Sequence, residues 1–322
     1  MANTTRTQLP AEVNNFYDRR LLDQAIPSFV YNRFAQVRDI PANSGTDTIK
    51  FRRYGLLTAV TTPLVEGVTP TAQQLSVTDI TATVLYYGSY VTISDKVTFE
   101  TYDPILTETA EIFGEQVGDS LDQLCRDVVT ATTTKQYATG VAGTSSITSA
   151  MIINRTEIKK AVRTLKVANA KPITDMIDPT DGISTTAIGR SFIGIIHPRT
   201  TYDLDDAQGW IPVEKYPNKT GVMPDEVGAL ANVRFLESTN AKVRSGAGSG
   251  SIDVYSTLII GKNAYAQTRI SNMTLQNIVM PLGSAGTADP LKQRVTSGWK
   301  LAYVAKILND AFMVDIQHAV SS

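Results

Sequence analysis

The sequence predicts an α+β fold, in which strands, one long helix and a mixed unit of strands and helices follow one another along the chain. Three observations support this prediction. Residues 46–95 are rich in Thr, Val, Ile and Tyr and alternate apolar with polar side chains, as half-buried strands do. Residues 104 to about 133 carry apolar side chains at steps of three and four, which is typical of an amphipathic helix. From 150 to about 270, strand-like and helix-like segments alternate.

The composition is that of a globular protein with a sizeable core. Of the 322 residues, 42% are hydrophobic, and this length predicts roughly one to three structural units. The chain has 30 basic and 31 acidic residues, so no basic field indicates nucleic-acid binding, and the balance disfavours a membrane-surface role.

Three further features suggest where the protein is made. Cys125 is the single cysteine, which excludes a disulfide within the chain and suits a reducing cytosol. No apolar run is long enough to span a bilayer. The start of the chain, "MANTTRTQLPAEVNN", lacks the layout of a secretory signal. We therefore expect a soluble product made and used in the cytoplasm.

Residues 1–45 are predicted to form an N-terminal arm. They contain many large apolar side chains, and Pro27 and Pro41 prevent one long helix. Because so many apolar groups are unfavourable in a solvated tail, the arm is expected to lie on a surface, either on its own domain or on something else.

Residues 46–95 are predicted to form a long β-ribbon, with loop chemistry near Pro63, Gly67 and Pro70 and a bulge or bend at Gly88. A strand of around 20 residues would reach ~65 Å, whereas a compact domain of this length is only ~50 Å across. An isolated two-stranded ribbon is marginal in water. Two alternatives follow: a ribbon that reaches a neighbouring molecule, and a shorter hairpin folded back on its own domain.

The helix from residue 104 has Asp103 as a plausible N-cap and Pro104 at its first position. A run to about residue 133 would be ~45 Å long. Gly114 and Gly118 disfavour helix, which predicts a close packing contact or a bend there. Cys125 lies beside the apolar stripe, and we interpret it as a small buried hydrophobe, not a reactive thiol.

The closing segment is predicted to be a β-hairpin. A turn at Asn309 and Asp310 separates two alternating strands. The residues expected to share a face are Trp299, Leu301, Tyr303, Ala305 and Ile307 in the first strand, and Phe312, Val314 and Ile316 in the second.

The usual motifs of nucleotide, hydrolase, zinc-protease and dithiol sites are missing from the sequence. His197, at a strand end, is the best single catalytic candidate, but a His-Pro strand terminator bonded to its own loop is the favoured interpretation. His318 is expected to be structural or exposed. Asp203, Asp205 and Asp206 could hold Mg²⁺, although first-turn helix residues are favoured. We predict no catalytic, cofactor-binding or metal-binding residue, and no cofactor.

A basic run, "KFRRYG", places Lys50, Arg52 and Arg53 on one strand. These side chains could touch phosphate, but alternation divides them between two faces, and no aromatic stacking platform accompanies them. An inter-subunit salt bridge, to Glu66 or another acidic residue, is the favoured interpretation.

Several stretches together resemble the major capsid proteins of tailed bacteriophages, which share the Hong Kong 97-like fold, and more closely the branch typified by Enquatrovirus podophages. "DPLKQRVTSGWK" (289–300) is the most telling, although that family more often has Gly where Val295 stands. The other stretches, in family order, are "FYDRRLL" (16–22), "FRRYG" (51–55), "VEGVTP" (65–70), "YGSYVTISD" (87–95), "GEQVGDSLDQLCRDV" (114–128), "IIGKNAYA" (259–266) and "ILNDAFMV" (307–314).

The resemblance implies a division of the chain into parts. These are an N-terminal arm (1–45), an extended loop that reaches over a neighbour (46–95), a peripheral domain with a spine helix (96–148), an axial domain (149–275), and a return to the peripheral domain in a C-terminal hairpin (276–322).

The resemblance also implies a function: a coat protein that self-assembles as pentamers and hexamers into an icosahedral head around double-stranded DNA. A scaffolding protein and a portal would be partners, with no sequence-specific DNA binding and no membrane. The subunit would be found in the virion, and in host cytoplasm during assembly. Inter-subunit contacts are expected at Tyr17, Leu21, Arg52, Arg53, Glu66, Arg294 and Trp299.

Two alternatives remain open at this point. An encapsulin-type nanocompartment subunit would share the fold and enclose cargo enzymes. A soluble α/β hydrolase would use His197 or the Asp203 cluster, against which the empty motif search argues.

Overall fold

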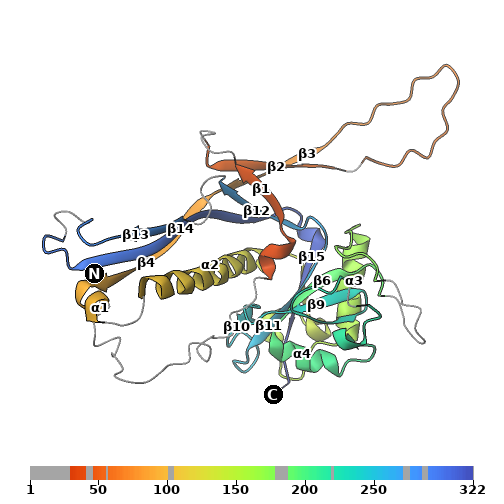
Figure 1. The fold of residues 1–322 in the computed structure, drawn as a ribbon. Helices are drawn as coiled ribbons and strands as arrows, with labels where there is room; N and C mark the ends of the chain where they lie inside the picture. The colour runs from red at the N-terminus through yellow and green to blue at the C-terminus, as the bar shows by residue number, and fades with distance from the viewer. Residues whose placement is uncertain are drawn as a thin grey trace.

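The computed structural model describes residues 30–40, 46–55, 57–100, 105–177, 188–218, 221–270, 276–284 and 289–321. These residues form an elongated sheet with a long helix against it, a compact unit of sheet and helices, and a two-stranded ribbon that projects from the junction of the two (Figure 1). The subunit is therefore far from spherical.

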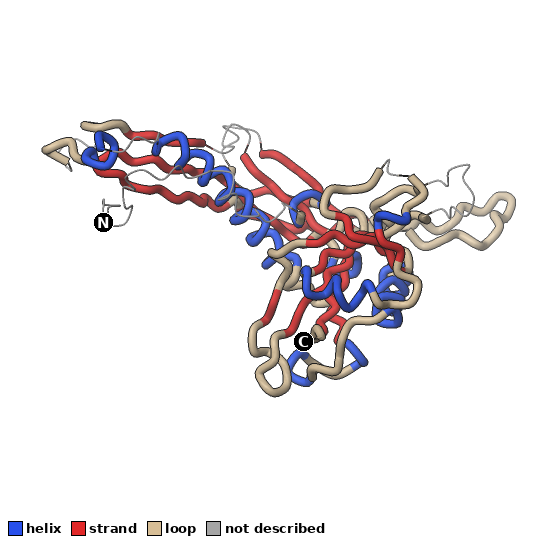
Figure 2. Tube along the Cα trace, turned by 60° about the horizontal axis from the view of Figure 1, so that its bottom comes forward, coloured by secondary structure: helices blue, strands red, loops and turns tan. Residues whose placement is uncertain are grey.

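The elongated sheet is built around one long strand, β14 (Arg294–Ile307). Strand β4 pairs along one edge of β14, while β13 and β12 pair with successive parts of its other edge, and β1 pairs with β12 in parallel (Figure 2). The bounds of these strands are β1 Gln36–Ile40, β4 Leu85–Ser94, β12 Tyr265–Ile270 and β13 Gln276–Met280. A short helix, α1 (Asp95–Glu100), follows β4.

The long helix predicted from the apolar stripe is α2 (Ile105–Val129), which lies against the elongated sheet. Its 25 residues correspond to ~37 Å at 1.5 Å per residue, so it ends earlier than expected. Phe113 and Val117 are buried against the sheet, as the stripe predicts. The proposed cap, Asp103 and Pro104, lies outside the described residues.

The compact unit contains an eight-stranded sheet in the order β5-β15-β11-β6-β9-β8-β7, with β10 also paired to β11. Helix α3 (Arg155–Val167) and helix α4 (Pro198–Asp205) contribute to a core on one face of this sheet. The strands are β5 Lys135–Tyr137, β6 Phe192–Ile196, β7 Ile211–Pro212, β8 Glu226–Leu230, β9 Val233–Glu237, β10 Val243–Arg244, β11 Val254–Ile260 and β15 Met313–His318. Short 3₁₀ turns occur at Tyr31–Phe34, Ala138–Gly140, Thr144–Ser146, Val213–Lys215 and Asp310–Phe312.

One continuous hydrophobic core joins the two sheets. Cys125 and Val129, at the C-terminal end of α2, pack in the same cluster as Ile193 and Leu258 of the compact unit and Tyr303 of the elongated sheet. Burial of these side chains in one cluster fixes the compact unit and the elongated sheet to each other.

The C-terminal hairpin predicted from the sequence is wrong. Strand β14 belongs to the elongated sheet, whereas β15 pairs with β11 and β5 in the compact unit. Strand β12 already pairs with Val304–Ile307, the end of β14 from which a hairpin would begin. The Asp310 carboxylate accepts hydrogen bonds from the hydroxyls of Thr132 and Thr133, each at 2.6 Å, which ties the connection to the end of α2 and directs the chain into the other sheet.

The predicted long ribbon strand is also divided in two. Strand β3 (Val77–Thr83) pairs with β2 (Thr48–Tyr54), and after Val84 the chain continues as β4 in the elongated sheet. The ribbon is therefore short, and its reach comes from the loop between its strands. The predicted bulge at Gly88 is wrong, because the pairing of β4 with β14 is regular there.

The close contact predicted at Gly114 and Gly118 is not found within the described part of the chain. A Cβ built at either glycine would meet no atom within 4 Å.

Candidate assembly interface

The loop at the end of the ribbon is the first candidate surface, and we refer to residues 57–76 as the ribbon loop. Every one of these residues is exposed. The loop closes on itself at its base, where the Gly55 amide donates to the Ser76 carbonyl at 2.9 Å. A turn at its tip brings the Val68 amide within 3.1 Å of the Val65 carbonyl, and Gly67 takes a positive φ of 76° there.

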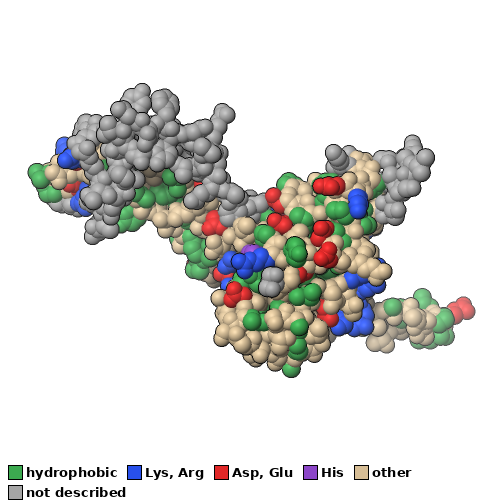
Figure 3. All heavy atoms as spheres, turned by 90° about the horizontal axis from the view of Figure 1, so that it is seen from below, with side chains coloured by type: hydrophobic (Ala, Val, Ile, Leu, Met, Phe, Trp, Pro, Cys, Tyr) green, Lys and Arg blue, Asp and Glu red, His purple; other side chains and the backbone are tan. Residues whose placement is uncertain are grey.

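The ribbon loop is apolar but has no core of its own. Its aliphatic side chains are between half and three-quarters exposed, and Glu66 is its single charged residue. Figure 3 shows the loop standing clear of the body, with hydrophobic side chains along it. The exposed aliphatic residues are Leu57, Val60, Leu64, Val65, Val68 and Leu75. Exposed apolar groups gathered in this way are typical of a surface that another molecule covers.

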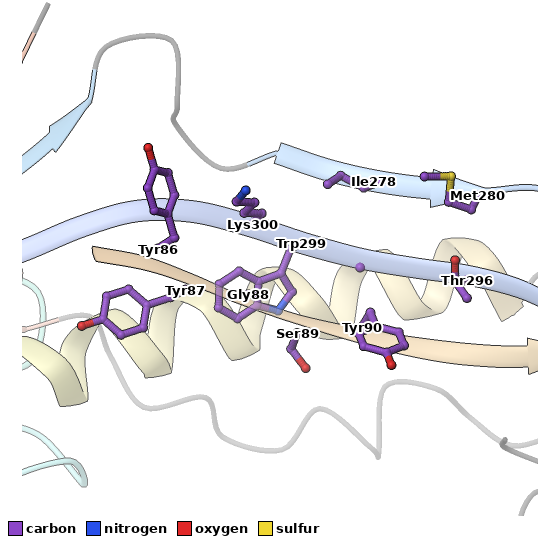
Figure 4. A pocket seen from close by; sticks show the side chains of 11 residues that line it. Tyr86, Tyr87, Gly88, Ser89, Tyr90, Ile278, Met280, Thr296, Trp299 and Lys300 are labelled. Carbon is purple, nitrogen blue, oxygen red and sulfur yellow. The ribbon is translucent and has the colours of Figure 1, made fainter. Parts of the chain in front are cut away.

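The second candidate surface is the face of the elongated sheet that points away from α2. Alternation divides β14 between two faces: Trp299 and Leu301 pack in the core with α2, while Gly298 and Lys300 face outward. The outward residues of β4, β13 and β14 line a groove of about 500 Å³, which we call the outer groove (Figure 4). Its side walls come from Tyr86, Tyr90, Ile278 and Met280.

The predicted contact residues fall in different environments. Tyr17 and Leu21 lie outside the described residues. Arg52 pairs with Asp79 across the ribbon, with Nε to Oδ1 at 3.0 Å, so its carboxylate partner is in the same chain. The inter-subunit bridge that we favoured for Arg52 therefore has a competitor within the subunit.

The remaining predicted contacts are spread over the molecule. Arg53 is exposed on the ribbon, and Glu66 is exposed in the ribbon loop. Arg294 lies at the start of β14, where its Nε is 3.8 Å from Asp289 Oδ2. Trp299 is 7% exposed, and its Nε1 donates to Gln116 Oε1 of α2 at 2.9 Å, so it contributes to the subunit's own core. Contacts between subunits at these positions stay predictions.

Sequence reasoning missed the outer groove and undervalued the ribbon loop. Pro63, Gly67 and Pro70 predict a turn and nothing more, whereas the aliphatic residues between them, with one charge among them, indicate an exposed apolar surface. For the groove, the signal was a strand with aromatic residues on both faces, at Tyr86 and Tyr87. Which of the two faces is covered depends on where α2 packs, and the pattern of residues within the strand does not predict this.

The two histidines have structural positions. His197 is the N-cap of α4, where its Nδ1 accepts from the Arg199 amide at 3.1 Å, which confirms the strand-terminator interpretation. Burial, and then the Arg199 guanidinium, lower the pKa of His197. His318 is fully buried, with Nε2 2.9 Å from Thr257 Oγ1 and Nδ1 2.8 Å from the Ala319 carbonyl oxygen.

The prediction that the acidic cluster lies in the first turn of a helix is wrong. Asp203 to Asp206 stand at the C-terminal end of α4. Asp203 is buried and accepts hydrogen bonds from the Ser321 amide, at 3.1 Å, and from the Ser321 hydroxyl. Among the described residues, no group of three or more His, Cys, Asp or Glu side chains could hold a metal ion. No helix in the described part of the chain is both long enough and apolar enough to cross a membrane.

A buried polar cluster anchors the first described residues to α2. The Asp122 carboxylate accepts from the Tyr31 amide at 2.7 Å, and the Tyr31 carbonyl accepts from the Tyr265 hydroxyl. The Tyr303 hydroxyl donates to Asn32 Oδ1. Cys125 is buried beside them, as predicted, and burial raises the pKa of its thiol to about 12. Residues 30–34 thus fasten the N-terminal end of the described chain to the junction of the two sheets.

Comparisons with known proteins agree with this architecture. No protein-family model matches the sequence, and no curated protein matches it. The capsid structure of the cyanophage P-SCSP1u matches with a TM-score of 0.65 and 13% identity, covering 100% of this chain and 96% of the other. The capsid of Ralstonia phage GP4 matches with a TM-score of 0.69 and 12% identity over 92% and 89% of the two chains. The head structure of Helicobacter pylori bacteriophage KHP40 matches with a TM-score of 0.62 and 13% identity over 99% and 98%.

These likenesses identify the class of fold. The chain has the mixed α and β architecture of the Hong Kong 97-like capsid fold, as the sequence predicted. The match extends over nearly all of this chain and of the cyanophage chain, so the elongated sheet, the ribbon and the compact unit all belong to that fold.

Proposed function

We propose that this chain is the major capsid protein of a tailed bacteriophage, which self-assembles into the icosahedral head shell that encloses the double-stranded DNA genome. One observation carries the proposal: within a phage capsid fold, the apolar ribbon loop projects from the subunit and has no core of its own. Such a loop is stabilised only when another molecule covers it.

The mechanism that follows is assembly and not turnover. Apolar burial contributes about 25 cal/mol per Å², so several modest contacts per subunit add up to a stable shell. Closed symmetry then lets identical surfaces meet repeatedly without an open end. The near balance of 30 basic and 31 acidic residues suits an inner wall that does not bind packed DNA tightly.

Finer assignments belong to the same proposal. The elongated sheet with α2 corresponds to the peripheral domain and the compact unit to the axial domain. The N-terminal arm, residues 1–45, includes strand β1, which pairs at the edge of the elongated sheet. The motifs from "FYDRRLL" to "ILNDAFMV" support a place in the Enquatrovirus-type branch. Pentamers and hexamers, a scaffolding protein and a portal are the expected partners, in the host cytoplasm during assembly and in the virion afterwards.

Electron microscopy and sedimentation velocity of the full-length chain test the proposal. We expect closed particles or ring-shaped oligomers, obtained in dilute buffer or promoted by polyethylene glycol as a crowding agent. A chain that stays monomeric at every concentration would refute it. Particles isolated from infected cells that protect protein cargo, and no DNA, from digestion would favour a nanocompartment instead.

A further inference from the structure

We propose that a cavity at the base of the ribbon binds phosphate groups, and we call it the ribbon cavity. It has a volume of about 570 Å³ and is lined by β1, by β2 and by the turns that contain Asn263 and Asn309. Strands β1 and β2 lie beside each other where the ribbon leaves the elongated sheet (Figure 1). The site belongs to the single folded subunit, so the inference does not rest on the proposed function.

The packing of β1 against β2 directs two arginine side chains to the ribbon cavity. Ile40 of β1 and Ile49 of β2 pack in one apolar cluster, so these faces of the two strands are turned toward each other. Because side chains alternate along a strand, Arg38 shares the face of Ile40, and Arg53 shares the face of Ile49. Two guanidinium groups from separate strands therefore border one cavity.

Within the described part of the chain, every charged residue that lines the ribbon cavity is basic. Arg52 is paired with Asp79, and Lys50 lies on that same outer face of β2. Arg38 and Arg53 differ, because neither forms a hydrogen bond or an ion pair with a described residue. The positive charge of the cavity therefore comes mainly from two arginines without a counter-charge, although the chain as a whole is nearly neutral.

Side-chain amides add hydrogen-bond donors around the two arginines. Gln36 shares the face of Arg38 on β1, and Asn263 and Asn309 line the cavity from their two turns. The Asn309 Oδ1 atom accepts a hydrogen bond within its own turn, at 3.3 Å, so its Nδ2 group is left to donate. The ribbon cavity thus combines guanidinium and amide donors, and no carboxylate of the described residues lines it.

The arrangement of these donors favours phosphate over carboxylate. The donors come from separate segments, so the ligand must accept hydrogen bonds from several directions. A carboxylate presents its two oxygens in one plane, whereas a phosphate presents its oxygens tetrahedrally, and arginine binds phosphate with paired hydrogen bonds. Phe51, Leu308 and Phe312 supply apolar walls, and a cleft of one charge sign with such walls concentrates counter-ions.

Two sources of phosphate fit a cavity of this size. A water molecule takes up about 30 Å³ of the liquid, so about 570 Å³ has room for more than one phosphate group. Free polyphosphate and the backbone of DNA both present phosphates in series. The chemistry that the cavity recognises is the same for both, and a competition experiment separates them.

Equilibrium dialysis of the full-length chain against tripolyphosphate, at constant ionic strength and without divalent cations, tests the site. We expect saturable uptake at a single site per chain. Arg38→Ala together with Arg53→Ala should weaken binding at least about tenfold, because charge-assisted hydrogen bonds are lost. The matched control, Lys159→Ala together with Arg163→Ala, removes the same charge from the exposed face of α3 and should bind like the wild type.

Asn263→Asp is a second variant, which changes the charge of the ribbon cavity and keeps its shape. Asn263 has a positive φ of 60°, a conformation that aspartate also adopts, so the fold should be retained. The added carboxylate repels phosphate, and binding should be lost. Thermal unfolding without ligand checks that each variant is folded. Wild-type affinity in both R38A/R53A and N263D would overturn the inference, as would a wild-type chain without saturable uptake.

Competition identifies the source of the phosphate. If the cavity binds the DNA backbone, a short duplex displaces tripolyphosphate, and R38A/R53A lowers the salt dependence of duplex binding. Displacement by inorganic phosphate and not by the duplex indicates a free phosphate ligand. A glutamate-rich peptide that binds more tightly than either phosphate probe would assign the cavity to carboxylates and overturn the inference. Electron microscopy scores particle formation separately, so normal particles without phosphate binding would refute this inference alone.

Discussion

The carboxylate of Asp122, on helix α2, accepts a hydrogen bond of 2.7 Å from the backbone amide of Tyr31, 91 positions earlier in the chain. Both residues are fully buried, so the bond fixes residues 30–34 to the junction between the elongated sheet and the compact unit. Burial raises the pKa of Asp122 to about 6, although the amides around it oppose that rise.

This pKa predicts how Asp122→Asn changes the pH dependence of stability. Because the folded pKa lies above the usual value of 3.8, the wild-type carboxyl stabilises the folded state most when it is protonated, and that contribution is lost as the pH rises from about 4 to 6. Two pKa units correspond to about 3 kcal/mol. The difference in unfolding free energy between wild type and D122N should change by that amount between pH 3 and 7 in urea denaturation. A constant difference would contradict the assignment.

His318 should make the stability of the folded protein depend on pH in the opposite direction from Asp122. Burial lowers its pKa from 6.5 to about 4, so the folded protein keeps a neutral imidazole while the unfolded chain binds a proton. Its contribution to stability is therefore present above pH 6.5 and is lost as the pH falls toward 4, by about 3 kcal/mol. His318→Asn should remove this acid sensitivity, measured by thermal unfolding at several pH values. An H318N variant with the wild-type acid slope would show that another group titrates.

Arg234 and Glu226 form a buried ion pair, and the Tyr216 hydroxyl also donates to Glu226 at 2.7 Å. Arg234→Leu leaves the carboxylate buried without its cation, so we expect a loss of about 3–5 kcal/mol in unfolding free energy. Adding Glu226→Leu should recover much of that loss, because neither charge is then buried alone. The comparison of single and double variants by urea denaturation distinguishes this pair from a simple packing defect.

Removal of the ribbon loop should uncouple folding from assembly. Gly55 and Ser76 already face each other, so an Asn-Gly turn in place of residues 56–75 can join the ribbon strands directly. A deletion of 56–86 would also remove β3 and the start of β4, and the shorter replacement avoids this. We expect a folded, soluble subunit that forms no closed shells by electron microscopy. Complete particles from this variant would refute a role for the loop.

Cys125 should be nearly inert in the native state. Burial raises the pKa of its thiol from 9.0 to about 12, which lowers the thiolate fraction near pH 8 by about a thousandfold, as three pKa units require. A colorimetric thiol reagent should therefore react at least a thousand times more slowly with the native chain than with the chain in urea. Rapid native reaction would indicate that the core around α2 opens.

The local pattern of apolar, proline and glycine residues determined several helices and turns of this protein. The apolar stripe of α2 and the His-Pro junction at 197–198 are set by neighbours in sequence, so they were predicted correctly. The ribbon loop could also be placed, because Pro and Gly mark it as non-helical and its flanking strands alternate.

The tertiary structure decided what each strand pairs with and what covers each face. Strands β14 and β15 look like a hairpin in sequence, yet they belong to different sheets, because β12 pairs with the end of β14 and Asp310 accepts a hydrogen bond from Thr132, just after α2. Asp122 is buried because residues 30–34, far from it in sequence, pack against α2 and donate a hydrogen bond to its carboxylate. Likewise, the face of the elongated sheet that carries the outer groove is left open because α2 covers the other face. Pairing and coverage depend on groups distant in the chain, and no local pattern records them.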